Sequence, residues 1–135
     1  MNEHFLHHGF TIDGILHLSP KQAYECCLTG AIILDVREDY EVAIKDFGIK
    51  EKLLCPFTDF EKQCITLPRD KPLIVADCVG IHSHDTARIL IGKGFTMTAN
   101  MAGGIVDWER DGLPMKTDIE SMNGPCACQI KSRPA

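Results

Sequence analysis

Two short, almost entirely apolar runs constrain the fold of this chain most strongly. Residues 31–36 read Ala-Ile-Ile-Leu-Asp-Val, and residues 73–76 read Leu-Ile-Val-Ala. Continuous apolar runs of this length are typical of strands that are buried on both faces of a parallel sheet. Helix-forming segments separate these runs from the other strand-like segments, so strands and helices alternate along the chain. The alternation predicts an α/β fold whose parallel strands are joined by right-handed crossovers.

Capping residues indicate where the helices begin. Ser19 and Gln22 have the spacing of a capping box, and Pro20 stands at the first helical position. Thr58 and Glu61 have the same spacing and predict another helix start. With the hydrophobic pattern, these signals predict strands at 15–18, 31–36, 53–55, 73–76 and 95–101, and helices at 20–28, 38–44, 58–65, 83–93 and 103–112.

The size and charge of the chain fit a single domain. The 135 residues suit one core, which we expect over residues 15–114, between a flexible leader at 1–14 and a polar tail at 115–135. The formal net charge of −5 argues against a nucleic-acid or anionic-membrane partner. No apolar run approaches the roughly 18–20 residues that span a bilayer, and no signal peptide is visible, so we predict a cytoplasmic protein.

The seven cysteines do not indicate a disulfide framework, because their number is odd and the chain shows no secretory signal. Cys26, Cys55 and Cys64 lie among apolar neighbours, so we expect them to be buried and inert. Cys26 and Cys27 are adjacent on a predicted helix and cannot both face one site. A structural role is therefore expected for this pair as well.

The ends of two predicted strands form the candidate site, because ligands of open α/β sheets bind beyond the carboxyl ends of the strands. One end is the segment 35–38, Asp-Val-Arg-Glu, and the other is the segment 77–83, Asp-Cys-Val-Gly-Ile-His-Ser. The second segment joins a buried strand directly to a helix start. Its backbone N–H groups can therefore form an anion-binding cradle, in which Gly80 allows the tight curvature. The alternative is an ordinary strand-to-helix turn with an aspartate near a helix start.

Three motifs between about Leu18 and Pro114 resemble those of rhodanese-like domains. Residues 33–37, Ile-Leu-Asp-Val-Arg, are similar to a leucine-aspartate-valine-arginine segment of that family, and residues 72–83 to its buried strand and active-site loop. Residues 101–114 are similar to its closing segment, with Gly-Gly, a tryptophan and Gly-Leu-Pro at the family's spacing. The resemblance implies a three-layer α/β/α fold with a small, mainly parallel sheet of about five strands. It also implies transfer of sulfane sulfur from donors such as thiosulfate to a loop cysteine, and then to a thiol acceptor.

The register of the loop places an unusual residue at the family's nucleophile position. The family loop reads cysteine, two variable residues, glycine, one variable residue, arginine and serine. With Gly80 and Ser83 matched without a gap, Asp77 takes the cysteine position and His82 the arginine position. Residues 46–51 also lack the family's usual His-Ile-Pro-Gly-Ala segment. The substrate-binding positions that the resemblance implies are Asp35, Arg37, Val79, Gly80, Ile81, His82 and Ser83.

An aspartate at that position changes the expected chemistry. A carboxylate cannot form a persulfide, and it repels a unit negative charge about 4 Å away by about 4 kcal/mol at an effective dielectric of about 20. We expect the Asp77 carboxylate to accept hydrogen bonds from the loop N–H groups instead, as a bound anion would. We therefore predict a domain without ordinary thiosulfate sulfurtransferase activity. Its 77–83 loop is expected to bind a protein partner, a small thiol or a sulfane-sulfur compound.

The sequence also allows a sulfur-handling enzyme. If the loop is shifted by one residue, Cys78 becomes the nucleophile of an active sulfurtransferase or persulfide carrier. The tail pair Cys126 and Cys128 can relay sulfur, form a strained disulfide or supply half a metal site, or can be incidental. Metal binding through His82, His84 and cysteines is a weaker hypothesis, because no tetrahedral ligand spacing is visible. The sequence predicts no cofactor.

Overall fold

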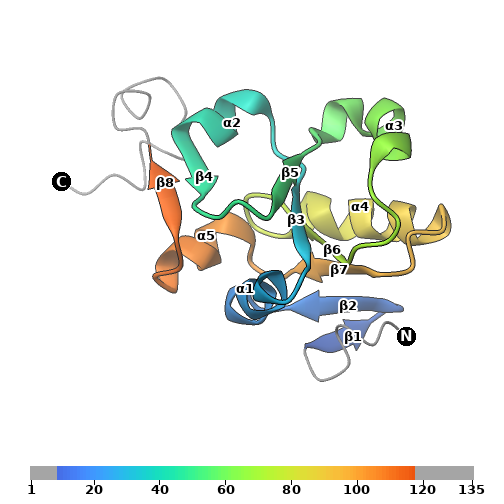
Figure 1. Ribbon diagram of the computed structural model, residues 1–135, viewed down its shortest axis with the longest axis horizontal. Coiled ribbons are helices and arrows are strands. Elements are labelled where there is room, and N and C mark those ends of the chain that lie inside the picture. Colours follow the sequence, from blue (N-terminus) through green and yellow to red (C-terminus); the bar gives the residue numbers. More distant parts are fainter. Residues whose placement is uncertain (1–8, 118–135) are drawn as a thin grey trace.

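The computed structural model describes residues 9–117, which form a six-stranded sheet between helices, with a two-stranded sheet beside it (Figure 1). Its first half contains β1 (Phe10–Ile12), β2 (Ile15–Leu18), α1 (Pro20–Leu28), β3 (Ile32–Asp35), α2 (Asp39–Ile44), β4 (Lys45–Phe47) and β5 (Lys52–Leu54). Its second half contains η2 (Phe57–Asp59), α3 (Phe60–Gln63), η3 (Cys64–Thr66), β6 (Leu73–Ala76), α4 (Ile81–Gly92), β7 (Thr98–Met101), α5 (Gly104–Arg110) and β8 (Met115–Thr117). The predicted α/β architecture is confirmed.

The central sheet is mainly parallel, as the apolar runs predict. Its strand order is β1-β2-β7-β6-β3-β5, in which β1 is antiparallel to β2 and the other neighbouring pairs are parallel. It has six strands rather than about five, because β1 adds an antiparallel edge. Strands β3 and β6 are neighbours, with Ile33 opposite Ile74 and Asp35 opposite Ala76. Both strands end at the same edge of the sheet, so the segments that follow them meet there.

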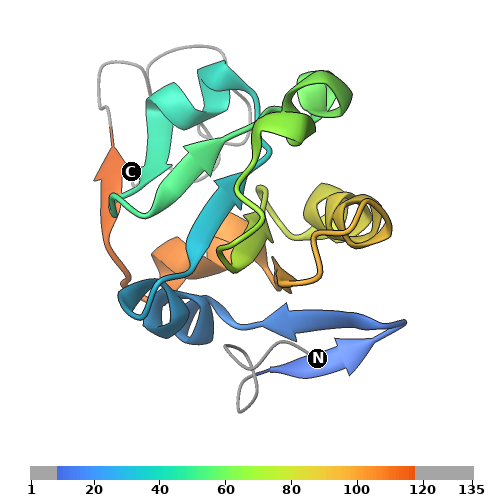
Figure 2. The ribbon, with the colours of Figure 1, turned by 45° about the vertical axis from the view of Figure 1, so that its right-hand side comes forward.

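Side chains of the central strands alternate between two cores. Ile33 and Ile74 belong to one core together with residues of α1 and α5, whereas Leu34 and Val75 belong to the other together with residues of α3 and α4. Figure 2 shows the helices of these two sets on opposite sides of the sheet. Successive residues of a strand point to opposite faces. Because both faces are covered, β3 and β6 are apolar at nearly every position.

Trp108 anchors the closing segment of the domain. Its side chain is fully buried and packs edge-to-face against Tyr24 and Phe47, with ring centroids 5.7 and 5.0 Å away. Its indole Nε1–H donates a hydrogen bond to the carbonyl oxygen of Pro114 at 2.7 Å, so the buried indole leaves no donor unsatisfied. These contacts fix α5 in place, and α5 in turn contacts the 77–83 loop.

One of the two predicted capping boxes is confirmed. The Gln22 N–H donates to Ser19 Oγ at 3.2 Å, and the Ser19 N–H donates to Gln22 Oε1 at 3.0 Å. The prediction for Thr58 is wrong, because a 3₁₀ turn occupies residues 57–59 and α3 begins only at Phe60. The hydroxyl of Thr58 donates to the Glu38 carboxylate instead, at 3.0 and 3.1 Å to its two oxygens. A contact with another element therefore overrides the local capping signal.

Three short strands lie where the sequence predicts none. β1 occupies Phe10–Ile12 inside the predicted flexible leader, and β8 occupies Met115–Thr117 at the start of the predicted tail. β8 pairs antiparallel with β4, which was also not predicted. Three residues are too few for a sustained two-residue alternation. For β1 the overlooked signal is Asp13-Gly14, a two-residue turn with positive φ at both positions that joins β1 to β2. Cys126 and Cys128 lie outside the described residues.

The buried thiols match the prediction for Cys26, Cys55 and Cys64, which are each at most 2% exposed. Burial raises the pKa of Cys26 and of Cys55 to about 11, and that of Cys27 to about 12. Since the thiolate is the reactive form, the raised pKa values keep Cys26, Cys27 and Cys55 inert near neutral pH.

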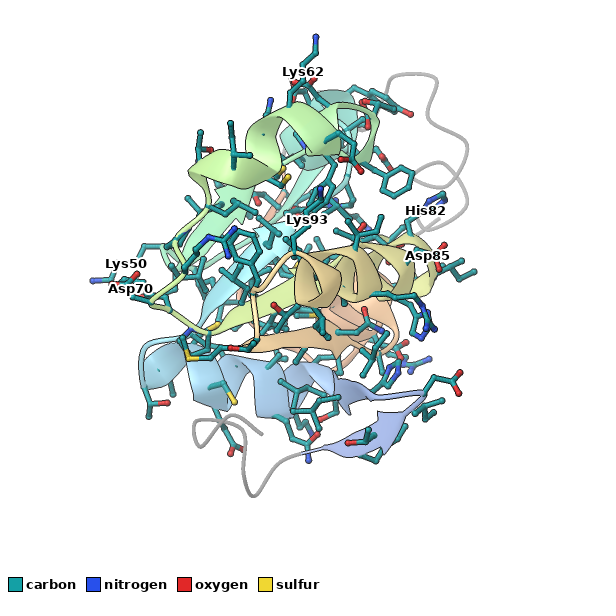
Figure 3. The ribbon with its side chains drawn as sticks, turned by 90° about the vertical axis from the view of Figure 1, so that its right-hand side faces the viewer. Lys50, Lys62, Asp70, His82, Asp85 and Lys93 are labelled. Atoms are coloured by element: carbon teal, nitrogen blue, oxygen red, sulfur yellow. The ribbon has the colours of Figure 1, made fainter. Side chains whose placement is uncertain are left out.

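Helix α4 leads away from the candidate loop along the surface. His82 and Asp85 lie at its beginning and Lys93 follows its last turn (Figure 3). Its buried side, which includes Ala87 and Leu90, packs on the sheet. Neither α4 nor any other helix within residues 9–117 has the length and hydrophobicity needed to cross a bilayer. The cytoplasmic location stays a prediction.

His17 on β2 is a buried histidine between two aromatic rings. Its imidazole stacks on Phe10 and on His84, with ring centroids 5.5 and 5.3 Å away, and its Nδ1 lies 3.1 Å from Asn100 Nδ2. Within residues 9–117, Nε2 of this ring has no hydrogen-bond partner. Burial, followed by the neighbouring His84, lowers the pKa of His17 below 6.5.

The lowered pKa of His17 predicts a loss of stability in acid. The unfolded chain binds the proton with the ordinary pKa, whereas the folded chain resists it, so the free energy of unfolding falls as the pH drops below about 6.5. Urea denaturation at about pH 7.5 and about pH 5.5 is expected to show a smaller fall for His17→Gln than for the unmodified protein. Equal falls in the two proteins would contradict this assignment.

Candidate functional site

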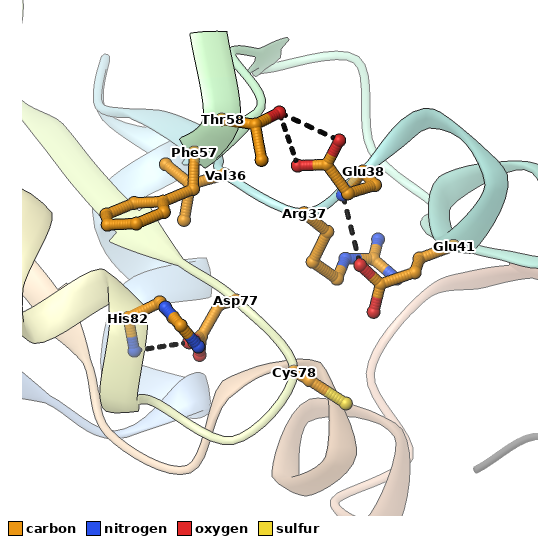
Figure 4. A pocket seen from close by; sticks show the side chains of 9 residues that line it. All are labelled: Val36, Arg37, Glu38, Glu41, Phe57, Thr58, Asp77, Cys78 and His82. Carbon is orange, nitrogen blue, oxygen red and sulfur yellow. Dashed lines mark hydrogen bonds between the residues drawn. The ribbon is translucent and has the colours of Figure 1, made fainter. Parts of the chain in front are cut away.

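The carboxyl ends of β3 and β6 meet at a pocket of about 330 Å³ (Figure 4). One wall comes from the segment after β3, another from the 77–83 loop after β6, and a third from η2. The residues that line it are Val36, Arg37, Glu38, Glu41, Phe57, Thr58, Asp77, Cys78 and His82. The pocket therefore joins the two strand ends that the sequence identified as the candidate site.

The carboxylate of Asp77 lies in a ring of loop N–H groups, as the sequence analysis expects. It accepts hydrogen bonds from the backbone N–H groups of Gly80, His82 and Ser83, the last two at 2.7 and 3.3 Å. The hydroxyl of Ser83 lies 3.4 Å from Asp77 Oδ1. The N–H groups of Gly80, His82 and Ser83 form what we call the amide cradle. Because N–H groups in the first turn of a helix lack intrahelical partners, Asp77 satisfies donors at the start of α4 that would otherwise need a ligand or water.

Helix α5 supports the loop from behind. The N–H groups of Ile105 and Val106 donate to the carbonyl oxygens of Asp77 and Cys78 at 2.9 and 3.1 Å. A Cβ atom at Gly104 would lie 2.5 Å from each of these two oxygens, so only glycine allows this approach. The packing of α5 against the loop therefore explains the second glycine of the Gly-Gly pair in the closing motif.

Arg37 is buried and fully engaged beside the pocket. Its Nε and Nη2 donate to the two oxygens of Asp35 at 3.0 and 2.7 Å, and its Nη1 donates to the carbonyl oxygen of Lys45 at 2.8 Å. The side chains of Arg37 and Asp35 are each 3% exposed. A bidentate pair of this kind fixes both groups and neutralises the guanidinium. Arg37 thus lines the pocket, but the carboxylate of Asp35 already neutralises its charge.

Cys78 lines the pocket but does not occupy the amide cradle. Its side chain is half-buried, and in Figure 4 it points away from the Asp77 carboxylate. The sulfur therefore lies apart from the carboxylate that accepts the hydrogen bonds of the amide cradle.

The mouth of the pocket joins Glu38, from the predicted segment 35–38, to three residues that sequence reasoning did not assign to the site: Glu41, Phe57 and Thr58. Glu38 accepts the hydroxyl of Thr58, and its backbone N–H donates to Glu41 Oε1 at 3.1 Å. Phe57 contacts the ring of His82 edge-on, with centroids 5.2 Å apart. Glu38 directly follows the Asp-Val-Arg motif and belongs to the strand end that the sequence identified. Phe57 and Thr58 reach the pocket through an unpredicted 3₁₀ turn.

The structure separates the predicted site residues into three groups. Arg37, Asp77, Cys78 and His82 line the pocket, whereas Asp35 and Ser83 bind those residues from behind. The remaining three belong to the loop without lining the pocket: Val79, Gly80 and Ile81, of which Val79 is 50% and Ile81 67% exposed.

A metal centre finds no support in the described part of the chain. Residues 9–117 contain no group of three or more His, Cys, Asp or Glu side chains placed to bind one ion. His84 stacks on His17 on the side of α4 that faces β2, and not at the pocket. The hypothesis of a site built from His82 and His84 therefore gains nothing from the structure.

Comparisons with known proteins identify the family. No family model matches the chain. A protein named thiosulfate sulfurtransferase GlpE, from Actinobacillus pleuropneumoniae serotype 7, is 30% identical over 105 residues, which cover 74% of this chain and 92% of that protein. A rhodanese-related protein of Thermoplasma volcanium superimposes with a TM-score of 0.68 and 24% identity, covering 76% of this chain and 98% of that one. The chain belongs to the single-domain rhodanese-like family.

Other rhodanese-like structures share the fold. The polysulfide-sulfur transferase homodimer of Wolinella succinogenes superimposes with a TM-score of 0.69 at 24% identity, covering 78% of this chain and 80% of that one. The rhodanese-like α/β architecture that the sequence motifs imply is thus confirmed.

The Asp35–Arg37 pair predicts a large stability effect. Asp35→Asn leaves a buried guanidinium without its counter-charge, so we expect the free energy of unfolding to fall by about 3–5 kcal/mol in urea denaturation. Glu61→Gln, which breaks an exposed pair with Lys93, is the matched control and should cost at most about 1 kcal/mol. Similar losses in the two variants would contradict the role of Asp35.

The amide cradle predicts a cost for removing its acceptor. Asp77→Ala leaves the Gly80, His82 and Ser83 N–H groups without the carboxylate, and we expect a loss of about 1–3 kcal/mol in urea denaturation. Asp85→Ala removes an exposed carboxylate from the same helix and should change stability by less than about 0.5 kcal/mol. An Asp77→Ala protein as stable as the unmodified one would show that the loop does not depend on this carboxylate.

Proposed function

We propose that this rhodanese-like domain is a binding module without thiosulfate sulfurtransferase activity, because Asp77 stands at the family's nucleophile position. The observation on which the proposal rests is the amide cradle. In an enzyme of this type, those N–H groups would stabilise the anionic sulfur on a loop cysteine. Here a carboxylate already accepts them.

The carboxylate opposes sulfur transfer in two ways. It cannot form a persulfide, so a sulfane sulfur atom has no acceptor within the cradle. Its negative charge also repels thiosulfate by about 4 kcal/mol at about 4 Å and an effective dielectric of about 20, which corresponds to about three decades in affinity.

The charges around the cradle do not compensate for this repulsion. Arg37 is bound to Asp35 through both carboxylate oxygens. His82 stands at the position of the family's arginine, so the fixed positive charge of a guanidinium is missing there. A dianionic donor would therefore meet no uncompensated cation among the described residues that line the pocket.

The surface around the loop favours a binding role. Val79, Ile81 and Phe57 are large apolar side chains that are 50%, 67% and 39% exposed, and all three belong to the segments that form the pocket. Exposed apolar side chains that gather around a pocket often mark an interaction site. The proposed ligands are a protein partner, or a small thiol or sulfane-sulfur compound.

One observation supports a second candidate function, persulfide transport by Cys78. The Cys78 side chain lines the pocket and is half-buried. Its thiolate would attack the outer sulfur of thiosulfate, the S–S bond to the sulfonate would break, and sulfite would leave with the electron pair. The product would be a persulfide on Cys78, formed outside the amide cradle and without its N–H groups.

An activity assay separates the two candidates. Purified protein with thiosulfate and cyanide is expected to form no thiocyanate above the uncatalysed rate. Mass spectrometry after treatment with thiosulfate is expected to show no adduct of about +32 Da, one sulfur atom, on Cys78. Robust turnover would overturn the proposal, and a Cys78 adduct that is lost in Cys78→Ser would establish the second candidate.

Asp77→Cys provides a gain-of-function test of the register. A thiol at residue 77 would lie within reach of the Gly80, His82 and Ser83 N–H groups, so this variant should gain the adduct of about +32 Da at residue 77. The matched control is Val79→Cys, whose thiol lies on the same loop but is exposed. Sulfur uptake by Val79→Cys and not by Asp77→Cys would contradict the assignment of Asp77.

A further inference from the structure

We propose that the pocket between β3 and β6 binds a lysine or arginine side chain of a partner protein. The proposal deepens the binding function above and rests on it. It combines two independent features: the balance of charge in the pocket, and the exposed apolar side chains of the loop that forms one of its walls.

The pocket is acidic because its one guanidinium is already neutralised. Glu38, Glu41 and Asp77 contribute three carboxylates, against the single guanidinium of Arg37, which is paired with Asp35. Within residues 9–117, no ion pair involves any of the three carboxylates.

Four lysines of the described residues do not neutralise the negative charge of the pocket, because they pair with other carboxylates or lie away from it. Lys45 pairs with Glu109 at 2.8 Å, and Lys93 lies 3.4 Å from Glu61 on α3. Figure 3 shows Lys50 and Lys62 at the edges of the molecule, away from His82. A cation that enters from outside is therefore attracted to the pocket.

The three carboxylates have different roles. The charge of Asp77 is stabilised by the N–H groups of the amide cradle at the start of α4. Glu38 and Glu41 are half-buried; they form the capping box at the start of α2, and Glu38 also accepts a hydrogen bond from the Thr58 hydroxyl. Each retains acceptor capacity, because an ionised carboxylate has about four lone-pair sites. Glu38 and Glu41 are thus the pair available to an incoming cation.

The walls of the pocket suit the stem of a long basic side chain. Val36 provides an aliphatic surface, and the rings of Phe57 and His82 meet edge-on at 5.2 Å. Lysine and arginine place an apolar stem along such surfaces while the charged group reaches a polar partner. A cation near the face of Phe57 gains a further cation–π attraction.

The rim of the pocket favours a protein over a free amine. Val79 and Ile81 belong to the same loop as the pocket residues Cys78 and His82, and both are at least half exposed. A small amine would fill the pocket and leave these side chains in water. A protein that presents a basic residue among apolar neighbours would cover both, and an arginine within an apolar patch is a common centre of protein interfaces.

Titration of the full-length ¹⁵N-labelled protein with blocked peptides tests the proposal. The probes are acetyl-Leu-Lys-Leu-amide, acetyl-Leu-Arg-Leu-amide, the same peptide with uncharged norleucine in the centre, and n-butylamine. We expect the two basic peptides to shift the amide signals of Glu38, Thr58, Cys78 and His82 in a saturable way. The norleucine peptide should bind at least about tenfold more weakly, and added salt should weaken the basic peptides.

Charge-neutral variants locate the binding site. Glu38→Gln and Glu41→Gln should each weaken the lysine peptide by about three- to tenfold. Glutamine retains a carbonyl oxygen that can accept the Thr58 hydroxyl or the Glu38 N–H, so both variants preserve the local hydrogen bonds. Glu25→Gln on α1 changes the net charge equally at an exposed position on the other side of the sheet, and should leave the affinity unchanged.

Every other result of the peptide titrations would contradict one part of the proposal. Equal affinity for the lysine and norleucine peptides would exclude recognition of the cation, and unchanged pocket signals would exclude the site. Butylamine binding as tightly as the lysine peptide would exclude the contribution of the rim and point to a small amine. None of these results affects the thiosulfate assay, so failure of this inference is distinguishable from failure of the proposed function.

Discussion

The hydrogen bonds between the Asp77 carboxylate and the N–H groups of the amide cradle are the interaction on which the rest of the site depends. They satisfy donors at the start of α4 that a helix leaves without partners. They also define the curvature of the loop, because Gly80 adopts a positive φ of 94° within the ring that they close. Helix α5 can then pack behind the loop through Gly104. An internal anion thus replaces the ligand that this geometry is suited to bind.

At the neighbouring strand, too, a carboxylate of the protein itself takes the place that an anionic ligand could occupy. Asp35 at the end of β3 binds Arg37 through two oxygens and removes its charge from the pocket. With the cradle filled by an acid and the guanidinium neutralised, the charge that remains at the mouth comes from Glu38 and Glu41. A fold whose relatives include proteins named thiosulfate sulfurtransferases therefore presents an acidic pocket here. The acidic pocket is the common basis of the two proposals, the lack of thiosulfate sulfurtransferase activity and the binding of a basic partner residue.

The sequence predicted the parts of the structure that depend on local pattern. The apolar runs at 31–36 and 73–76 located the two central strands, and the loop register located Asp77. The parts that depend on tertiary contacts were not predictable. The three-residue strands β4 and β8 have no periodicity of their own and pair only with each other. Thr58 was interpreted as a helix cap although it binds Glu38 across the pocket. Phe57 reaches the site for the same reason.

Amide hydrogen exchange at His82 tests the central claim most directly. This N–H group lies in the first turn of α4, where the helix provides no acceptor, so its protection reports on Asp77 alone. We expect slow exchange of the His82 amide in the unmodified protein and fast exchange in Asp77→Ala, with the amides of the last turns of α4 unchanged. An His82 amide that exchanges as fast in the unmodified protein as in the variant would show that the carboxylate does not occupy the cradle.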